Sequence, residues 1–156
     1  MEKFGKSQSV LRTEDDRFLT GEGNYIDDST PSDSLYAYFF RSQVAHAKIV
    51  NLNVDDASGA AGVHGIFIAE DLENNGVKND LVGVTVKNHD GTNGASPKRS
   101  LLAKERVRFV GEPIALVIAN TIQNAKDAAE LIEVDYDDLP VLTELKKSKY
   151  TIHPEA

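Results

Sequence analysis

The stretch from Arg106 to Tyr136 constrains the fold most, because three hydrophobic patterns follow one another in it with almost no loop between them. Val107 and Phe109 alternate with arginines, which is typical of a half-buried strand. Residues 114–119 form an unbroken apolar run of strand length, which favours a strand covered on both faces in the middle of the core. Glycine and proline between these two parts indicate a corner or bulge at residues 111–113.

A helix is predicted directly after the apolar run. Asn120 or Thr121 can cap its first turn, and small or apolar residues then recur at helical spacing. This buried stripe consists of Ile122, Ala125, Ala128, Ala129 and Ile132. Alternation resumes in residues 132–136 as a final strand. The stretch therefore predicts a strand–helix–strand crossover, which is right-handed if its two strands lie parallel.

Three further strands are expected earlier in the chain, at residues 35–40, 45–54 and 66–68. The short connection between the first two favours an antiparallel hairpin. In the second strand, the alternation places Val50, Leu52 and Val54 on one face and Ile49 on the other.

Two short helices are also expected. Thr13 is predicted to cap the first, which Gly21 ends. Asp55 or Asp56 is predicted to cap the second, which ends near Gly62.

Size and composition exclude several classes of protein. The chain has 156 residues, which suits one domain, and it has no cysteine. Disulfides, thiolate zinc sites, thiol nucleophiles and cysteine-held iron–sulfur clusters are therefore excluded within these residues. The net charge of −8 argues against a nucleic-acid partner. Because no apolar run resembles a signal peptide or a membrane span, we expect a cytoplasmic protein with no membrane partner.

The titratable side chains give no recognisable catalytic or metal site. The four histidines, His46, His64, His89 and His153, are scattered, and no pair has the spacing by which one helix offers two metal ligands. His46 is predicted to be packed or hydrogen-bonded within a strand. The sequence has no nucleophile elbow and no phosphate-binding glycine loop. No residue is therefore assigned as catalytic, cofactor-binding or metal-binding.

Glu112 is the acid with the most unusual setting, because it lies between a glycine and a proline beside the densest apolar run. A carboxylate there needs a partner. It either accepts backbone amides at the corner or pairs with Arg108 or Arg106. A third interpretation, a catalytic acid or base acting with His46, lacks the converging groups that an active site requires.

Four segments carry a resemblance to a known family. They are RTEDDRFLTGEGNYIDD (12–28), RSQVAHAKI (41–49), LLAKERVRFVGEPIALVIA (101–119) and AKDAAELIEVDYDDLPV (125–141). In amino-acid sequence and in order they resemble the amino-terminal part of the large, molybdopterin-binding subunit of the xanthine dehydrogenase, aldehyde oxidase and carbon monoxide dehydrogenase family. The resemblance implies an α/β hammerhead domain, an α+β fold with a short mixed sheet packed by two main helices.

The resemblance also implies a domain organisation. Residues 11–145 would form the hammerhead domain, with a polar loop insertion at 73–100 that is functional or mobile. Residues 1–10 would be a flexible N-terminus and residues 146–156 a linker-like tail. Two departures from the family pattern are Gln43–Val44, where a proline is common, and the polar region from Asn74 to Ala95.

In that family the cofactor-binding residues and the catalytic glutamate lie downstream, so the resemblance transfers no catalytic residue to this sequence. It implies a scaffold role for Arg12, Asp15, Gly21, Gly23, Tyr25, Arg108, Gly111, Glu112 and Pro113.

The function implied is a structural or docking domain, or a split subunit, of a molybdenum hydroxylase that oxidises a small substrate with water as oxygen source. Its partners would be the molybdopterin-binding domain or chain and the iron–sulfur and flavin subunits. Molybdopterin cytosine dinucleotide, iron–sulfur clusters and FAD would belong to the complete enzyme. The alternative is a free-standing, non-catalytic binding or structural protein that retains the hammerhead fold.

Overall fold

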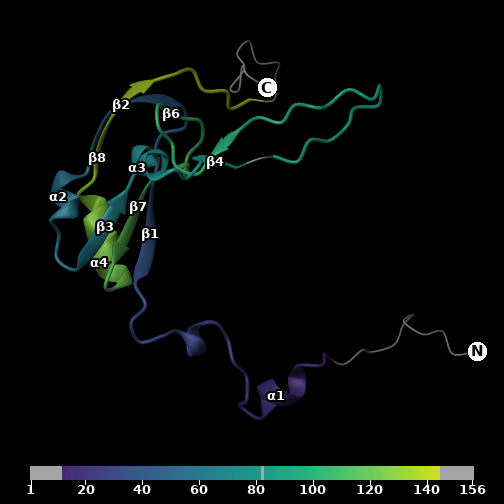
Figure 1. Ribbon diagram of the computed structural model, residues 1–156, viewed down its shortest axis with the longest axis vertical. Helices are drawn as coiled ribbons and strands as arrows, with labels where there is room; N and C mark the ends of the chain where they lie inside the picture. Colours follow the sequence, from purple (N-terminus) through teal and green to yellow (C-terminus); the bar gives the residue numbers. More distant parts are fainter. Residues whose placement is uncertain (1–11, 82, 145–156) are drawn as a thin grey trace, which may run out of the picture. The chain divides into compact units, whose positions relative to one another are not determined.

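The computed structural model describes residues 12–81 and 83–144. The chain divides into two compact units, Met1–Ser34 and Leu35–Ala156 (Figure 1). The segment 1–10, predicted to be flexible, and the linker-like tail 146–156 lie outside the described residues.

The first unit contains the helix α1 (Asp15–Leu19). The predicted cap by Thr13 is wrong, because the helix begins one residue later, after Glu14, and its N-cap has no side-chain hydrogen bond. Instead, two aspartates in the first turn interact favourably with the positive, N-terminal end of the helix dipole. Gly21 ends the helix as predicted: it adopts φ 76°, and the next amide, that of Glu22, donates to Arg17 O at 2.7 Å.

Local contacts shape the rest of the first unit. The short 3-10 helix η1 (Asp27–Ser29) follows Ile26, whose backbone has φ −57° and ψ −41°, and the Tyr25 N–H donates to Asp28 Oδ2 at 2.9 Å. The rings of Phe18 and Tyr25 stack with their centroids 5.5 Å apart. None of residues 12–34 is buried. These contacts fix turns, but the described residues of the unit form no core of their own.

The second unit contains two three-stranded antiparallel sheets. Sheet A has the order β1 (Tyr36–Arg41), β7 (Pro113–Ala119), β3 (Val63–Phe67). Sheet B has the order β6 (Arg106–Val107), β2 (Ala47–Asn53), β8 (Glu133–Asp138). Three helices accompany them: α2 (Asp55–Ser58), α3 (Ala69–Asn74) and α4 (Ile122–Glu130). The α+β class is confirmed, and the pairing is antiparallel in separate sheets where one short mixed sheet was expected.

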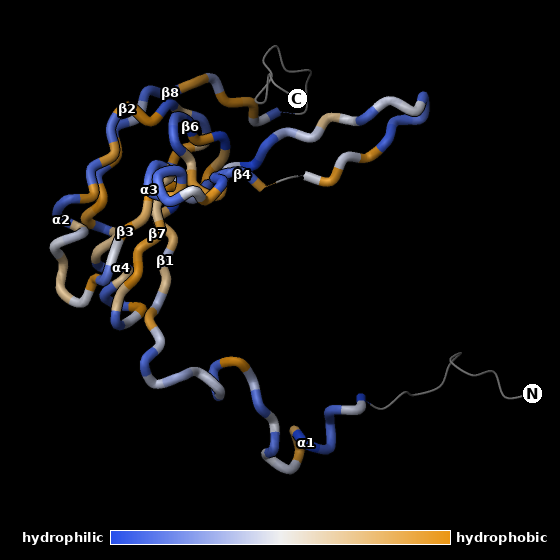
Figure 2. The backbone as a smooth tube through the Cα atoms, in the orientation of Figure 1, coloured by the Kyte–Doolittle hydropathy of each residue, from blue (hydrophilic) through white to orange (hydrophobic). Residues whose placement is uncertain are grey.

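The core lies between α4 and sheet A. The central strand β7 buries Ile114, Ala115, Val117 and Ala119 completely, as its unbroken apolar run predicts, and Figure 2 shows hydrophobic residues along it. On α4, three alanines at positions 125, 128 and 129 pack against this strand. Because alanine is short, the helix backbone lies close to the sheet. A second hydrophobic cluster joins sheet B to β7. Its buried residues include Ala47, Val107 and Ile114.

The predicted hairpin between the first two strands of the second unit is wrong. β1 pairs with β7 along its whole length, whereas β2 pairs with β6 and β8. The chain changes sheets at Ser42, whose Oγ donates to Val44 O at 2.8 Å and whose N–H donates to Glu112 O at 2.9 Å. The long apolar strand β7 offers β1 a better buried partner than its neighbour in sequence does.

The strand–helix–strand order of residues 113–138 is confirmed, but its two strands do not lie parallel in one sheet. β7 belongs to sheet A and β8 to sheet B. The helix α4 therefore links two sheets. Its cap is the predicted Thr121, whose side chain accepts the Asn124 N–H at 3.0 Å.

A β-bulge in β2 overturns the predicted faces of that strand. The register with β8 shifts between Ile49 and Asn51, so that Val50 is 68% exposed while Ile49 and Leu52 are partly buried. One extra residue in a strand reverses the alternation beyond it, and sequence periodicity does not show where such a residue lies.

Residues 77–101 form an arm whose base is the short pair β4 (Asp80–Leu81) and β5 (Arg99–Ser100). A bridge between Lys87 and Asn93 continues it toward the tip, which Figure 2 shows as hydrophilic. The arm is joined to the body where Asn79 exchanges two hydrogen bonds with the Leu102 backbone, at 2.8 and 2.9 Å. The helix α3 just before it was not predicted.

Candidate functional site

Glu112 lies at the corner before β7 and is 5% exposed. Its Oε2 accepts the backbone N–H of Arg108, and its Oε1 lies 3.7 Å from Arg108 Nη1. The corner is also joined to β1, because Arg41 Nη1 donates to Gly111 O at 2.9 Å. Both structural interpretations of Glu112, acceptance of a backbone amide and pairing with Arg108, are confirmed together.

The described histidines have different partners. His46 Nδ1 lies 2.9 Å from Pro140 O, and its Nε2 is buried without a hydrogen-bond partner. His64 Nε2 lies 2.6 Å from Asn120 Oδ1, and His89 is exposed on the arm. His153 lies outside the described residues. Within residues 12–81 and 83–144, no hydrogen bond or ion pair joins His46 to Glu112, and no three His, Asp or Glu side chains are grouped to hold a metal ion.

One groove of about 860 Å³ opens between the two sheets beside α4. Its lining comes from β1 and the turn after it (Ala37, Tyr38, Phe39, Phe40, Arg41, Gln43, Val44), from α4 (Lys126, Ala129, Glu130) and from β8 with the residue before it (Ile132, Val134, Tyr136). Burial in this region raises the pKa of the Tyr136 phenol, although a hydrogen bond with Ser42 opposes the shift. The sequence predicted the strand positions of β8 but not the groove, because the groove depends on how the sheets are paired.

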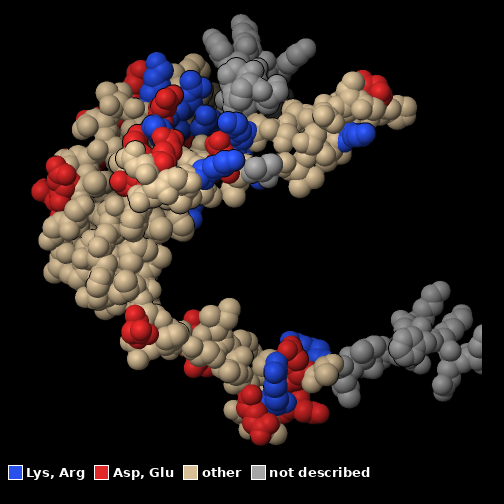
Figure 3. Space-filling view, viewed as in Figure 1, with Lys and Arg blue, Asp and Glu red and all other residues tan. Residues whose placement is uncertain are grey.

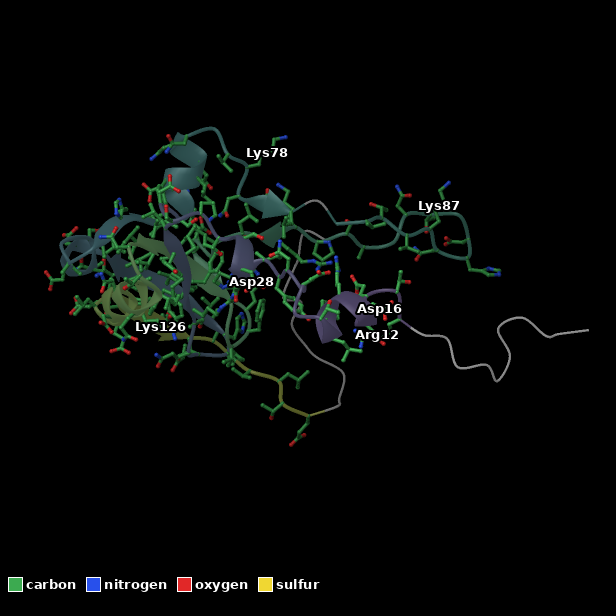
Figure 4. The ribbon with its side chains drawn as sticks, turned by 90° about the horizontal axis from the view of Figure 1, so that it is seen from below. Arg12, Asp16, Asp28, Lys78, Lys87 and Lys126 are labelled. Atoms are coloured by element: carbon green, nitrogen blue, oxygen red, sulfur yellow. The ribbon has the colours of Figure 1, made fainter. Side chains whose placement is uncertain are left out.

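Charged residues are unevenly distributed over the second unit. On the face shown in Figure 3, acids and bases mix over β2, β6 and α3, while few charges lie over β1, β3 and β7. Two cations, Arg41 and Lys126, and one acid, Glu130, line the groove. Figure 4 shows Lys126 on α4 and Lys87 on the arm.

Comparison with known proteins explains this architecture. The family model for the aldehyde oxidase and xanthine dehydrogenase a/b hammerhead domain matches residues 20–140. The chain belongs to this family. The hammerhead fold predicted from the sequence is confirmed, and the chain corresponds to a domain of enzymes of the molybdenum hydroxylase family.

Among curated relatives, the nicotine 6-hydroxylase large subunit of Paenarthrobacter nicotinovorans is 36% identical over 139 residues, which are 89% of this chain and 16% of that protein. The carbon monoxide dehydrogenase large chain of Hydrogenophaga pseudoflava is 35% identical over 138 residues, with 88% and 16% covered. The crystal structure of quinoline 2-oxidoreductase from Pseudomonas putida 86 superposes with a TM-score of 0.76 at 38% identity, covering 86% of this chain and 16% of that one. The chain thus spans about a sixth of the length of these relatives.

No helix within residues 12–81 and 83–144 combines the length and hydrophobicity needed to cross a bilayer.

Proposed function

We propose that this chain is the structural and docking part of a molybdenum hydroxylase of the aldehyde oxidase, xanthine dehydrogenase or carbon monoxide dehydrogenase type. The complete enzyme would oxidise a small substrate with water as oxygen source. The observation that supports this proposal is the match of the hammerhead family model to residues 20–140, in a chain that spans 16% of the length of its relatives.

The site chemistry supports a scaffold role. Glu112 and Arg108 are engaged with each other and with the backbone at the corner before β7. The sequence contains no cysteine, so it offers none of the thiolates that usually hold iron–sulfur clusters. We therefore assign the iron–sulfur clusters to other parts of the enzyme. We assign molybdopterin cytosine dinucleotide and FAD there as well, because the chain spans 16% of the length of its relatives, and we derive no reaction step through its residues.

A chimaeric enzyme tests the proposal. In the carbon monoxide dehydrogenase large chain of Hydrogenophaga pseudoflava, the matched 138 residues are replaced by those of this chain. We expect the chimaera to assemble with its partner subunits, to retain molybdenum and to reduce dye with carbon monoxide. A chimaera with the domain deleted is the control and should lose molybdenum. Equal molybdenum content and activity with and without the domain would overturn the proposal.

A further inference from the structure

The free edge of β1 faces the groove. In sheet A, β1 lies at one end of the order, and within residues 12–81 and 83–144 it pairs with β7 alone (Figure 1). The Ser42 N–H donates to Glu112 O and the Gly111 N–H to Ser42 O, so the backbone of Ser42 points toward the β7 side. The backbone groups of an antiparallel strand alternate in direction. Ala37, Phe39 and Arg41 therefore point their N–H and C=O groups away from β7.

This alternation runs without interruption along β1. The register shift near its end pairs Phe40 with Ala115 and Arg41 with Pro113, so the extra residue is Ile114 on β7. Tyr38 and Phe40 turn their side chains toward the core, where both pack against buried residues. At its free edge, β1 thus has three residues whose backbone N–H and C=O groups point away from β7.

The lining of the groove distinguishes a strand edge from side-chain faces. β1 contributes five consecutive residues, 37–41, which is the pattern of a backbone edge seen from the side. β8 and the residue before it contribute alternate residues, Ile132, Val134 and Tyr136, which is the pattern of one strand face. A backbone edge beside an apolar face suits an added strand, which binds through main-chain hydrogen bonds and places alternate side chains in the groove.

We propose that the groove takes up an extended segment of the molybdopterin-binding part of the large subunit, which adds to sheet A as a strand beside β1. This inference rests on the proposed function. It assigns the occupant to the large subunit because this chain spans 16% of the length of its relatives, so most of the polypeptide of such a subunit lies outside it.

The charges of the groove favour a particular kind of segment. Lys126 makes no ion pair within the described residues, whereas Arg41 already donates to Gly111 O and lies over the Phe39 ring. A segment with apolar side chains at alternate positions fits over Val134 and Tyr136. An acidic side chain in the same segment would pair with Lys126.

Amide hydrogen exchange of the full chain tests this pairing. The probe is a set of overlapping peptides from the Hydrogenophaga pseudoflava carbon monoxide dehydrogenase large chain, taken from outside the matched region. We expect one peptide to slow exchange at Ala37, Phe39 and Arg41 by about tenfold or more, the change expected for one main-chain hydrogen bond. Exchange at Tyr38 and Phe40, whose amides already face β7, should not change. Absence of any binding peptide, or binding without this alternation, overturns the inference.

Matched variants distinguish peptide binding through the backbone edge of β1 from peptide binding through the side chains of the groove. Ala37→Pro removes one outward N–H from an edge position that proline tolerates, and Ala37→Ser keeps it. Lys126→Glu reverses the charge in the groove, and Lys87→Glu makes the same change on the arm. We expect the first member of each pair to weaken peptide binding about tenfold and the second to leave it unchanged. If Ala37→Pro does not fold, the exchange pattern of the wild-type chain decides.

The outcomes distinguish the groove from the broader function. An active chimaera combined with peptide binding that Ala37→Pro and Lys126→Glu leave unchanged rejects the groove and keeps the proposed function. An inactive chimaera rejects the proposed function itself. Protection at Ala37, Phe39 and Arg41 that rises with the concentration of the chain alone would identify a second copy as the occupant and overturn the inference.

Discussion

The Glu112 carboxylate joins the corner before β7 to the end of β6. Glu112→Ala leaves the Arg108 amide without its acceptor and the half-buried guanidinium without its ion-pair partner. We expect the free energy of unfolding to fall by about 2 kcal/mol, measured by urea denaturation. Glu112→Gln, which keeps an acceptor, should cost less. The control is Glu105→Ala at an exposed acid, which should change stability by less than about 0.5 kcal/mol. A Glu112→Ala variant as stable as its control would show that the corner does not depend on this contact.

Gly62 combines a left-handed backbone with a close neighbour. Its φ is +78°, and an added Cβ would lie 2.1 Å from Asn124 Nδ2. Gly91 has a similar φ of +83° but open space around it. We expect Gly91→Ala to cost about 1–2 kcal/mol from the backbone alone and Gly62→Ala to cost more. In the Asn124→Ala background the two costs should become similar. Equal losses already in the wild-type background would contradict the steric argument.

Tyr136 makes stability depend on pH in the alkaline range. Burial raises its pKa above the ordinary value of 10.0. As the pH rises past about 10, the unfolded chain loses the phenolic proton first, so the stability from the neutral phenol is complete below this pH and is lost above it. The free energy of unfolding should fall more steeply for wild type than for Tyr136→Phe between about pH 9 and about pH 11. Every other group is the same in the two proteins, so the difference between the two profiles reports on Tyr136. Parallel pH profiles would exclude a contribution from Tyr136.

The helix α4 depends on a cap at its start and on alanines along one face. Thr121→Ala removes the acceptor for the Asn124 N–H and should destabilise the second unit by about 1 kcal/mol in thermal or urea unfolding. Thr121→Ser should restore most of this loss. Thr13→Ala is the matched control, because α1 has no side-chain cap, and it should have no measurable effect. A loss at Thr13 equal to that at Thr121 would contradict the assignment of the cap.

Some elements could be predicted from the sequence because their signals are local. The apolar run 114–119 and the alanine stripe of α4 determine burial without reference to distant residues. The strand partners of β1 and β2 were predicted wrongly, since the two strands are neighbours in sequence yet belong to different sheets. The bulge at Val50 depends on the partner strand, so it has no local signal.

The candidate site also combines features with local sequence signals and features that depend on long-range strand pairing. The contacts of the Glu112 carboxylate are made with Arg108, four positions away, and they were predicted. The groove combines β1, α4 and β8, and its strand edge exists only because β1 pairs with β7 rather than with β2. Because the sequence analysis paired β1 with β2 in a hairpin, it did not predict the free edge of β1. Surfaces that depend on long-range pairing are therefore the part that periodicity does not reveal.

At the scale of the whole molecule, the buried side chains of the described residues all belong to the second unit. Among the described residues, every buried one lies between Ser42 and Ile132. The first unit instead exposes large apolar side chains: Leu19 is 86% exposed, Tyr25 64% and Ile26 90%. Side chains of this kind, without a core beneath them, are typical of segments that become buried against another part of an assembly.

Removal of residues 1–34 is therefore expected to leave the second unit folded. The truncated chain should unfold cooperatively with the same urea midpoint as the full chain, because it keeps all of the described buried residues. Thr121→Ala should cost the same in both backgrounds, since sites without shared partners contribute additively. Binding of a peptide in the groove should also be unchanged, because its lining begins at Ala37. Loss of the cooperative transition would show instead that the first unit contributes to the folded core.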